Sequence, residues 1–327
     1  MKKNVVLLVI LLGIVLPSLL FNSDGTENVI EQKTEVKNIE SVTKFPIKVL
    51  DEDRIRIMEL EDYITGVVLG EMPASFEMEA LKAQSVATRT YTLRKILKQG
   101  KHIDADVCTD ASCCQAFVSK EDYLSSKGTK SDMERIEAAV WNTESEVITY
   151  NGELIEATYF SCSGGMTEDA VAVWGTEVPY LESVVSPGED QSKHFETQKI
   201  FTIKEFLTAL GLDPSKQLKR ENIVFTYTNG NGIETMTLFG STYTGTQLRQ
   251  LLNLPSTAFS LEIDGDQISI VSNGYGHRVG MSQYGADAMA LSGSNYDEIL
   301  LHYYKGTSIC RLTEAQLKAL FDKAGNI

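Results

Sequence analysis

The N-terminal segment is the feature that most constrains how this chain can fold. Two lysines are followed by an uncharged, mostly apolar run from Asn4 to Phe21, close to the roughly 20 residues that a helix needs to cross a bilayer. The lysines favour a cytoplasmic N-terminus, which places everything after Phe21 outside the cytoplasm. Because no small-residue cleavage signature follows, residues 1–22 are predicted to be an uncleaved single-pass membrane anchor. A cleaved signal peptide is the alternative.

The composition divides the rest of the chain. Residues 23–44 are polar and rich in Glu, Lys, Thr and Asn, which is typical of a stalk without a core of its own. From Phe45 onward, helical and strand-like patterns mix without a regular β–α–β alternation, and this favours the α+β class with antiparallel strands. We predict a core domain of residues 45–195 and 271–312, with a smaller α/β subdomain inserted at residues 196–270.

Two helices are predicted early in the core domain. The first covers Leu60–Leu69 and ends at Gly70, before Pro73. Ser75 is predicted to cap the second helix, which runs to about Leu97. That helix would carry two separate stripes. Its small residues are Ala80, Ala83, Ala87 and Thr90. Its polar residues are Lys82, Ser85, Arg89 and Thr92.

The acidic balance restricts the class of partner. The formal net charge is −15, so no surplus of Lys and Arg is available to neutralise phosphates, and nucleic acid is excluded as a partner. Any contact with an anionic substrate must therefore use local cations.

Glu71 is the first candidate for chemistry. It follows Val67-Val-Leu-Gly and precedes Met72 and Pro73. Apolar surroundings disfavour the charged form of a carboxyl group and raise its pKa, as a general acid at neutral pH requires. The alternative is a side chain that points to water from a turn between helices.

A histidine and three cysteines form the second cluster. Imidazole and thiolates are the usual tetrahedral zinc ligands, and His102, Cys108, Cys113 and Cys114 lie within one short loop, residues 101–116. Four protein ligands would close the site, so the zinc would be structural. A disulfide from Cys108 to Cys113 or Cys114 is the alternative, as is a site with three ligands and water.

Two glycine-rich segments form the third cluster. Residues 274–286 interleave glycines with His277, Ser282, Gln283 and Tyr284, and a shorter segment at residues 159–167 contains Ser163. Hydroxyls, amides and aromatic faces are suited to holding a sugar, although each segment alone could be a pair of tight turns.

These segments, in this order, resemble the stage II sporulation protein D family, which also includes amidase-enhancer proteins. The resemblance runs from about Phe45 to Tyr304. Its motifs are LEDYITGVVLGEMP at residues 60–73, EALKAQSVATRTY at 79–91, SGGMT at 163–167 and VGMSQYGA at 279–286.

The resemblance implies a lytic transglycosylase, a lyase that degrades peptidoglycan glycan strands already stripped of their stem peptides, during engulfment in sporulation. Glu71 would be its catalytic residue. The expected partners are the stage II sporulation proteins P and M. The chain departs from the family pattern at Arg278, which replaces a loop glycine, and at Cys113-Cys114, where some relatives have His-Cys. The second change keeps a zinc-competent donor at each position.

A single catalytic carboxylate fits this substrate. Muramic acid carries its own nucleophile, the C6 hydroxyl, so one Glu can serve first as acid and then as base, whereas ordinary glycosidases need two carboxylates. Glu61 and Asp62 are expected at the surface. Lys82 and Arg89 are predicted to hold the lactyl carboxylate or acetamido groups, and the remaining predicted substrate-binding residues are Ser163, His277, Ser282, Gln283 and Tyr284.

Two other functions fit the same residues. One is a non-catalytic protein that binds glycan and activates an amidase, which the family resemblance also covers. The other is a zinc-dependent amidase, which is disfavoured because a site closed by four protein ligands has no open position for water.

Overall fold

The computed structural model describes residues 45–98, 102, 104–126 and 128–323. These residues belong to one compact unit that begins at Thr43. The predicted anchor and stalk, residues 1–44, lie outside the described residues. Within the described ranges, no helix is both long enough and apolar enough to cross a membrane.

Helices form most of the first half of the described chain and its C-terminal part. In chain order they are α1 (Leu60–Glu71), α2 (Met78–Leu97), α3 (Lys120–Ser126), α4 (Lys130–Asn142), α5 (Ala170–Trp174), α6 (Ile203–Ala209), α7 (Gly245–Leu251), α8 (Gln283–Leu291), α9 (Tyr296–Tyr303) and α10 (Glu314–Lys323).

The strands are short and spread along the chain. They are β1 (Pro46–Asp51), β2 (Arg54–Glu59), β3 (Val107–Cys108), β4 (Glu146–Tyr150), β5 (Glu153–Leu154), β6 (Tyr159–Phe160), β7 (Glu196–Thr202), β8 (Ile223–Tyr227), β9 (Ile233–Leu238), β10 (Ser241–Thr244), β11 (Phe259–Asp264), β12 (Gln267–Asn273), β13 (Met281–Ser282) and β14 (Ser308–Arg311).

The strands pair into small sheets that are mostly antiparallel. The sheet orders are β2-β1-β3, β14-β4-β5, β13-β6, β10-β9-β8 and β11-β12-β7. Only the β1–β3 and β6–β13 pairs are parallel in the described chain. The predicted α+β class is confirmed.

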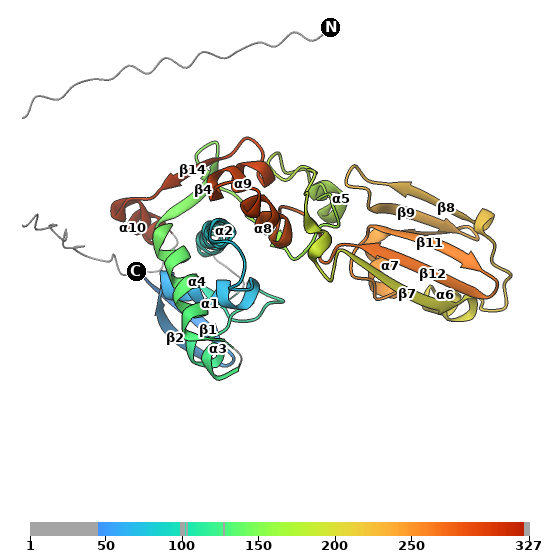
Figure 1. The fold of residues 1–327 in the computed structure, drawn as a ribbon, viewed down its shortest axis with the longest axis horizontal. Coiled ribbons are helices and arrows are strands. Elements are labelled where there is room, and N and C mark those ends of the chain that lie inside the picture. Colours follow the sequence, from blue (N-terminus) through green and yellow to red (C-terminus); the bar gives the residue numbers. More distant parts are fainter. Residues whose placement is uncertain (1–44, 99–101, 103, 127, 324–327) are drawn as a thin grey trace, which may run out of the picture. The chain divides into compact units, whose positions relative to one another are not determined.

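Helix α2 is the centre of the first hydrophobic core. It packs against α1, α4, α8, α9 and β4, and Figure 1 shows it end-on among these elements. Its small-residue stripe lets the neighbouring elements approach closely, and Ala80, Ala83 and Ala87 are fully buried. Most of the predicted polar stripe is buried too, because neighbours cover α2 on nearly every side.

Arg89 and Glu61 explain how polar groups are tolerated in this core. The Arg89 side chain is 0% exposed and donates two hydrogen bonds, of 2.8 and 2.6 Å, to the Glu61 carboxylate. It also donates to the carbonyls of Glu146 and Val140. A buried ion pair needs such additional hydrogen bonds to offset desolvation. The expected surface position of Glu61 is therefore wrong.

Two predicted helix boundaries are also wrong, each for a local reason. Helix α1 continues through Gly70 to Glu71, and a Cβ at Gly70 would lie only 3.1 Å from the Ala116 carbonyl carbon, so this glycine permits close packing rather than ending the helix. Helix α2 begins after Glu77, not Ser75. The Glu77 backbone N–H donates to the Asp287 carboxylate from α8 instead.

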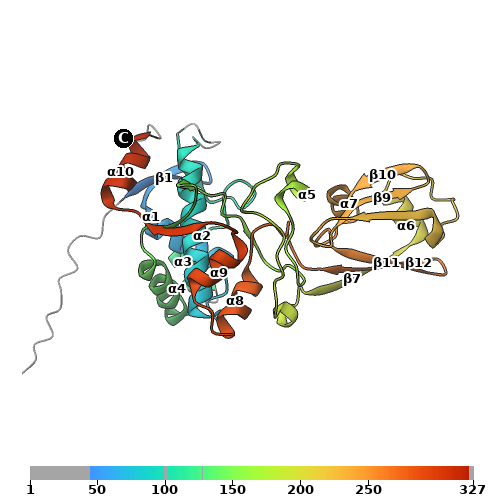
Figure 2. The same cartoon turned by 90° about the horizontal axis from the view of Figure 1, so that it is seen from above.

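The buried residues of a second hydrophobic cluster all lie between 206 and 270. Strands β7, β11 and β12 and the β8–β9–β10 meander surround it together with α6 and α7 (Figure 2). Strands β7 and β12 pair along their whole length, from Gln267 opposite Thr202 to Asn273 opposite Glu196. The chain thus enters and leaves this region on adjacent strands. The exact domain bounds given above stay predictions.

Candidate active site

A pocket of about 260 Å³ opens beside the C-terminal end of α1. Its walls come from α1, α2, the cysteine-containing loop, β6 and the glycine-rich loop before β13. The lining residues are Glu71, Tyr91, Ala111, Ser112, Cys113, Cys114, Gln115, Thr158, Tyr159 and His277. Among these, Glu71 alone carries a carboxyl group, and it shares the pocket with His277.

Glu71 is held in the pocket by the backbone that follows the cysteines. The Ala116 N–H donates a 2.9 Å hydrogen bond to Glu71 Oε1. Gly70 makes this contact possible, since any side chain there would crowd the Ala116–Phe117 backbone. Burial raises the pKa of the Glu71 carboxyl, and the Ala116 N–H and the Gln283 amide oppose part of that rise. Glu71 therefore favours the neutral acid more than an exposed glutamate does.

Tyr159 and Gln115 line the pocket as a hydrogen-bonded pair. The Tyr159 hydroxyl donates to Gln115 Oε1 at 2.8 Å, and Gln115 Nε2 donates to Thr92 on α2 at 2.9 Å. Burial, and then the nearby Glu71 carboxylate, raise the pKa of Tyr159 well above its usual value. The phenol thus stays protonated and adds no second negative charge beside Glu71.

His277 forms a neutral wall of the pocket. Burial and the Arg249 cation lower its pKa to about 4. Its Nδ1 accepts the Val279 N–H at 3.1 Å, and the ring also hydrogen-bonds the backbone of Tyr159. Both hydrogen bonds are made within the protein, so the neutral ring adds no charge to the pocket wall.

Two further aromatic rings flank the His277 imidazole. Phe160 lies 5.6 Å and Trp174 lies 5.7 Å from it, measured between ring centroids. Phe160 is buried, whereas Trp174, at the end of α5, is 44% exposed. An exposed indole beside a pocket wall is a surface on which a sugar ring can stack.

Arg278 anchors the loop that carries His277. Its φ of 66° is left-handed, and its side chain is 2% exposed. The guanidinium donates to the carbonyls of Ser163, Met166 and Gly230 at 2.7–2.9 Å. Arg278 is therefore turned inward and ties the loop to the region of β8–β9.

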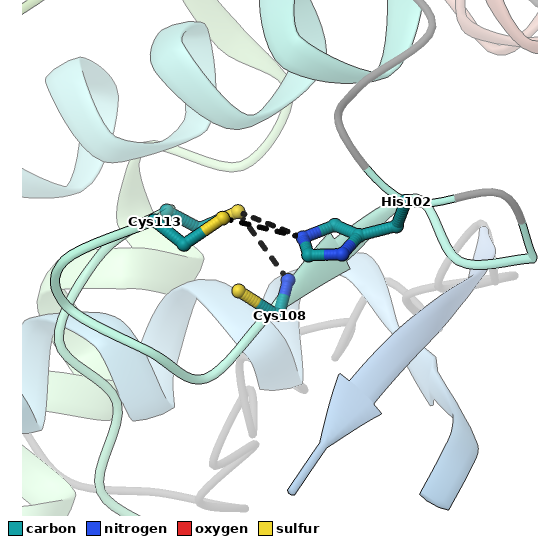
Figure 3. A group of neighbouring side chains, drawn as sticks. His102, Cys108 and Cys113 are labelled. Atoms are coloured by element: carbon teal, nitrogen blue, oxygen red, sulfur yellow. Dashed lines mark hydrogen bonds between the residues drawn. The ribbon is translucent and has the colours of Figure 1, made fainter. Parts of the chain in front are cut away.

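The predicted metal ligands lie together in one loop. The donor atoms of His102, Cys108, Cys113 and Cys114 all lie within 4.8 Å of one another, and Figure 3 shows the labelled side chains converging. His102 Nε2 is 3.5 Å from Cys113 Sγ and 3.8 Å from Cys114 Sγ. All five cysteines of the chain are free thiols.

The chemistry and spacing of this set fit zinc. Ligand atoms about 2.0–2.3 Å from a tetrahedral zinc lie roughly 3.3–3.8 Å apart, and the observed separations need only a small contraction. Strand β3 fixes Cys108 beside β1, while a turn at Asp110 accepts the N–H groups of both Cys113 and Cys114. Burial raises the pKa of Cys114 to about 12. Without a cation, the Cys114 thiol would stay protonated.

Most of the other predicted substrate-binding side chains do not line the pocket. Arg89 is closed off in its ion pair with Glu61, and its predicted contact with substrate is wrong. Lys82 pairs at 2.6 Å with Glu79 on the same helix, away from the pocket lining.

The glycine-segment residues are also mostly structural. Ser163 is fully buried and donates to Glu189, Ser282 caps α8 through the Gly285 N–H, and the Tyr284 ring packs on Phe76. These three predictions of substrate contact are not supported. Gln283 differs, because it is buried near Glu71 and its Nε2 makes no hydrogen bond of normal geometry with the described residues.

The pocket position of several residues was not predicted from the sequence. Tyr91, Gln115 and Tyr159 lie inside or next to recognised motifs, but nothing in their spacing separates them from core residues. Trp174 had only a weak signal, as a tryptophan directly before Gly175.

Comparison with known proteins identifies a matching family profile and several related proteins. The family profile described as Stage II sporulation protein matches residues 51–150. Stage II sporulation protein D of Bacillus subtilis (strain 168) is 35% identical, covering 94% of this chain and 96% of the relative. The protein of the same name from Bacillus amyloliquefaciens is 34% identical over 83% of this chain and 79% of its own. The amidase enhancer of B. subtilis is 30% identical, over 75% of this chain and 40% of its own.

Proposed function

The chain belongs to the stage II sporulation protein D family, a family of sporulation and the cell wall, and we propose that it is a lytic transglycosylase. In this role it cleaves peptidoglycan glycan strands, preferably those without stem peptides, and leaves 1,6-anhydro ends. The observation that most supports this proposal is that Glu71 is isolated from other carboxyl groups in the pocket. It is the one carboxyl among the described residues of the pocket, and its pKa is raised by burial.

The chemistry needs one group that can give and then take a proton. Neutral Glu71 donates its proton to the glycosidic oxygen, and the bond from that oxygen to C1 of muramic acid breaks. The resulting carboxylate removes the proton of the C6 hydroxyl while the C6 oxygen bonds to C1. Glu71 ends protonated again, and no water is consumed. Because the nucleophile belongs to the same sugar, the second step gains from proximity.

The neighbouring groups keep this acid ready. The Ala116 N–H orients Oε1 at 2.9 Å and stabilises the carboxylate once it forms. The neutral Tyr159 phenol and neutral His277 leave the neighbouring pocket walls uncharged. The exposed Trp174 indole supplies an apolar face for a pyranose ring.

A structural zinc ion belongs to this proposal. His102, Cys108, Cys113 and Cys114 would hold it, and when bound it would supply a rigid cross-link for a loop with little core of its own. Two of the ligands line the Glu71 pocket, and Ala116 follows directly after Gln115 in the same loop. The zinc loop thus positions the catalytic acid without taking part in proton transfer.

The remaining parts of the proposal concern location and partners. Residues 1–22 anchor the protein in the cell membrane, with the catalytic domain outside the cytoplasm. The stage II sporulation proteins P and M are its partners during engulfment. Both statements rest on the N-terminal sequence and on family membership.

The direct test is digestion of peptide-free glycan strands by the full-length chain in detergent. The wild-type protein should release fragments with 1,6-anhydro ends, identified by mass. Glu71→Gln should abolish them while leaving the thermal unfolding midpoint unchanged. Anhydro products from the Glu71→Gln variant would exclude Glu71 as the acid.

Similarity to an amidase enhancer supports one second candidate, a glycan-binding protein that activates an amidase. It predicts binding of glycan strands without any cleavage by the wild-type chain. The same digestion therefore separates the two candidates.

A further inference from the structure

The proposed substrate carries an anion that the predicted cations do not meet. A muramic acid residue without its stem peptide has a free lactyl carboxylate. Arg89 is committed to Glu61, and Lys82 is committed to Glu79. A different cation near the pocket has to be considered.

Arg249 lies on α7, beside the loop that carries His277. The Arg249 carbonyl accepts the Leu254 N–H at 2.8 Å, and the next residue, Pro255, accepts the Gly276 N–H at 3.1 Å. Gly276 immediately precedes the pocket residue His277. Two short backbone links therefore hold the end of α7 against the pocket loop.

The positive charge of Arg249 affects the protonation of His277 in the pocket wall. The Arg249 cation is the second cause, after burial, of the lowered pKa of His277. Burial also lowers the pKa of Arg249 itself, and only Tyr275 opposes that change. Tyr275 is 47% exposed, so this side of the pocket rim is open to a ligand.

Arg249 has no anionic partner among the residues that the structure describes. Its guanidinium forms no ion pair and no hydrogen bond within those ranges. The other arginines near the site do have partners, since Arg89 meets a carboxylate and Arg278 meets three carbonyls. A half-buried cation without a counter-ion is unfavourable in the free protein and is stabilised when an anion binds.

We propose that Arg249 binds the free lactyl carboxylate of muramic acid at the pocket rim. Through this contact, the region of residues 196–270 recognises peptide-stripped strands. This inference rests on the proposed function. When a stem peptide is attached, the carboxylate is an amide, which is neutral and cannot form the ion pair. Selection of stripped strands then comes from one charge contact.

The test compares native peptide-free strands with strands whose lactyl carboxylates have been converted to methylamides. Rates of anhydro-end formation and binding affinities are measured for the full-length wild type, Arg249→Gln and Arg249→Lys. Arg220→Gln is the matched control, because Arg220 is an exposed arginine of the same region that hydrogen-bonds the Ile223 carbonyl and lies over the Phe225 ring.

Amidation should weaken wild-type binding and cleavage by about tenfold to a hundredfold, as expected for a hydrogen-bonded charge pair. Arg249→Gln should be equally weak on both substrates, Arg249→Lys should keep part of the discrimination, and Arg220→Gln should behave as wild type. Full discrimination by Arg249→Gln overturns the inference. If the wild type binds strands but never cleaves them, the proposed function fails, while the binding comparison still decides the role of Arg249.

Discussion

At the scale of single residues, the protonation of Glu71 depends on a few identified contacts. Burial favours the neutral acid, whereas the Ala116 N–H and the Gln283 amide favour the carboxylate. The acid form must be present for the first proton transfer. Activity should therefore fall as the pH rises through the Glu71 pKa.

Replacing Gln283 by Leu should shift that fall in a defined direction. The Gln283 amide stabilises the charged form, so its loss raises the Glu71 pKa further, and the protonated acid persists to higher pH. The descending limb of the pH–rate profile should move upward. Tyr284→Phe, which alters a ring packed on Phe76 outside the pocket, should leave the limb in place. A limb that stays or moves downward for Gln283→Leu contradicts this account of the Glu71 environment.

Trp174 offers a second test at this scale. If its indole stacks on a sugar, Trp174→Ala should raise KM by roughly three- to tenfold with little change in kcat. Trp141→Ala is the matched control, because Trp141 is a similarly exposed tryptophan on α4, not part of the pocket lining. Equal effects of the two variants would argue against a stacking role.

At the scale of elements, the cysteine loop connects a candidate metal site to the catalytic acid. Its ligands are His102 before β3, Cys108 on β3 and the two cysteines of the following turn, and the end of the loop supplies the N–H that holds Glu71. Stability of the loop and geometry of the acid should therefore change together.

Removal of the metal should show this coupling. Purified protein should contain about one zinc per chain. Cys114→Ser, or treatment with a strong chelator, should remove the zinc, lower the unfolding midpoint by several degrees and reduce cleavage. Cys310→Ser, at an exposed position on β14, should change none of these. A metal-free wild-type chain of unchanged stability would rule out the zinc site.

The sequence predicts some elements well and others only in outline. Helix α1 and the body of α2 are predicted from the sequence, the first to within two residues of its C-terminal end. The start of α2 is not, because the Glu77 N–H finds its acceptor on α8, which is distant in sequence. Local patterns carry no information about such a partner.

The same limit applies to the site. The sequence points to Glu71 and to the histidine–cysteine set because each lies in one short segment. Polar side chains such as Arg89 and Ser163 look alike in sequence whether they meet a substrate or a buried carboxylate. Tyr159, Trp174 and Arg249 reach the pocket region only through tertiary packing, so their positions could not be predicted.

At the scale of the whole molecule, the Arg89–Glu61 pair joins α1 and α2 to the carbonyls of α4 and β4. Both side chains are buried, so each compensates the other's charge. This pair is a structural centre of the first core rather than a part of the active site.

Glu61→Ala should leave a buried, uncompensated Arg89 and lower the free energy of unfolding by about 3–5 kcal/mol. Urea denaturation measures this change. Glu134→Ala removes an exposed ion pair with Lys130 and should cost about 0–1 kcal/mol. Normal stability of Glu61→Ala together with weaker substrate binding would return Arg89 to the substrate-binding residues.

The central claim is that the C6 hydroxyl of the substrate, not water, completes a reaction driven by Glu71. Digestion of peptide-free glycan strands by the full-length protein in water labelled with heavy oxygen tests it most directly. We predict that mass spectrometry will find new muramic acid ends that are anhydro and carry no heavy oxygen. New ends that each contain one heavy oxygen atom would identify a hydrolase and contradict the mechanism.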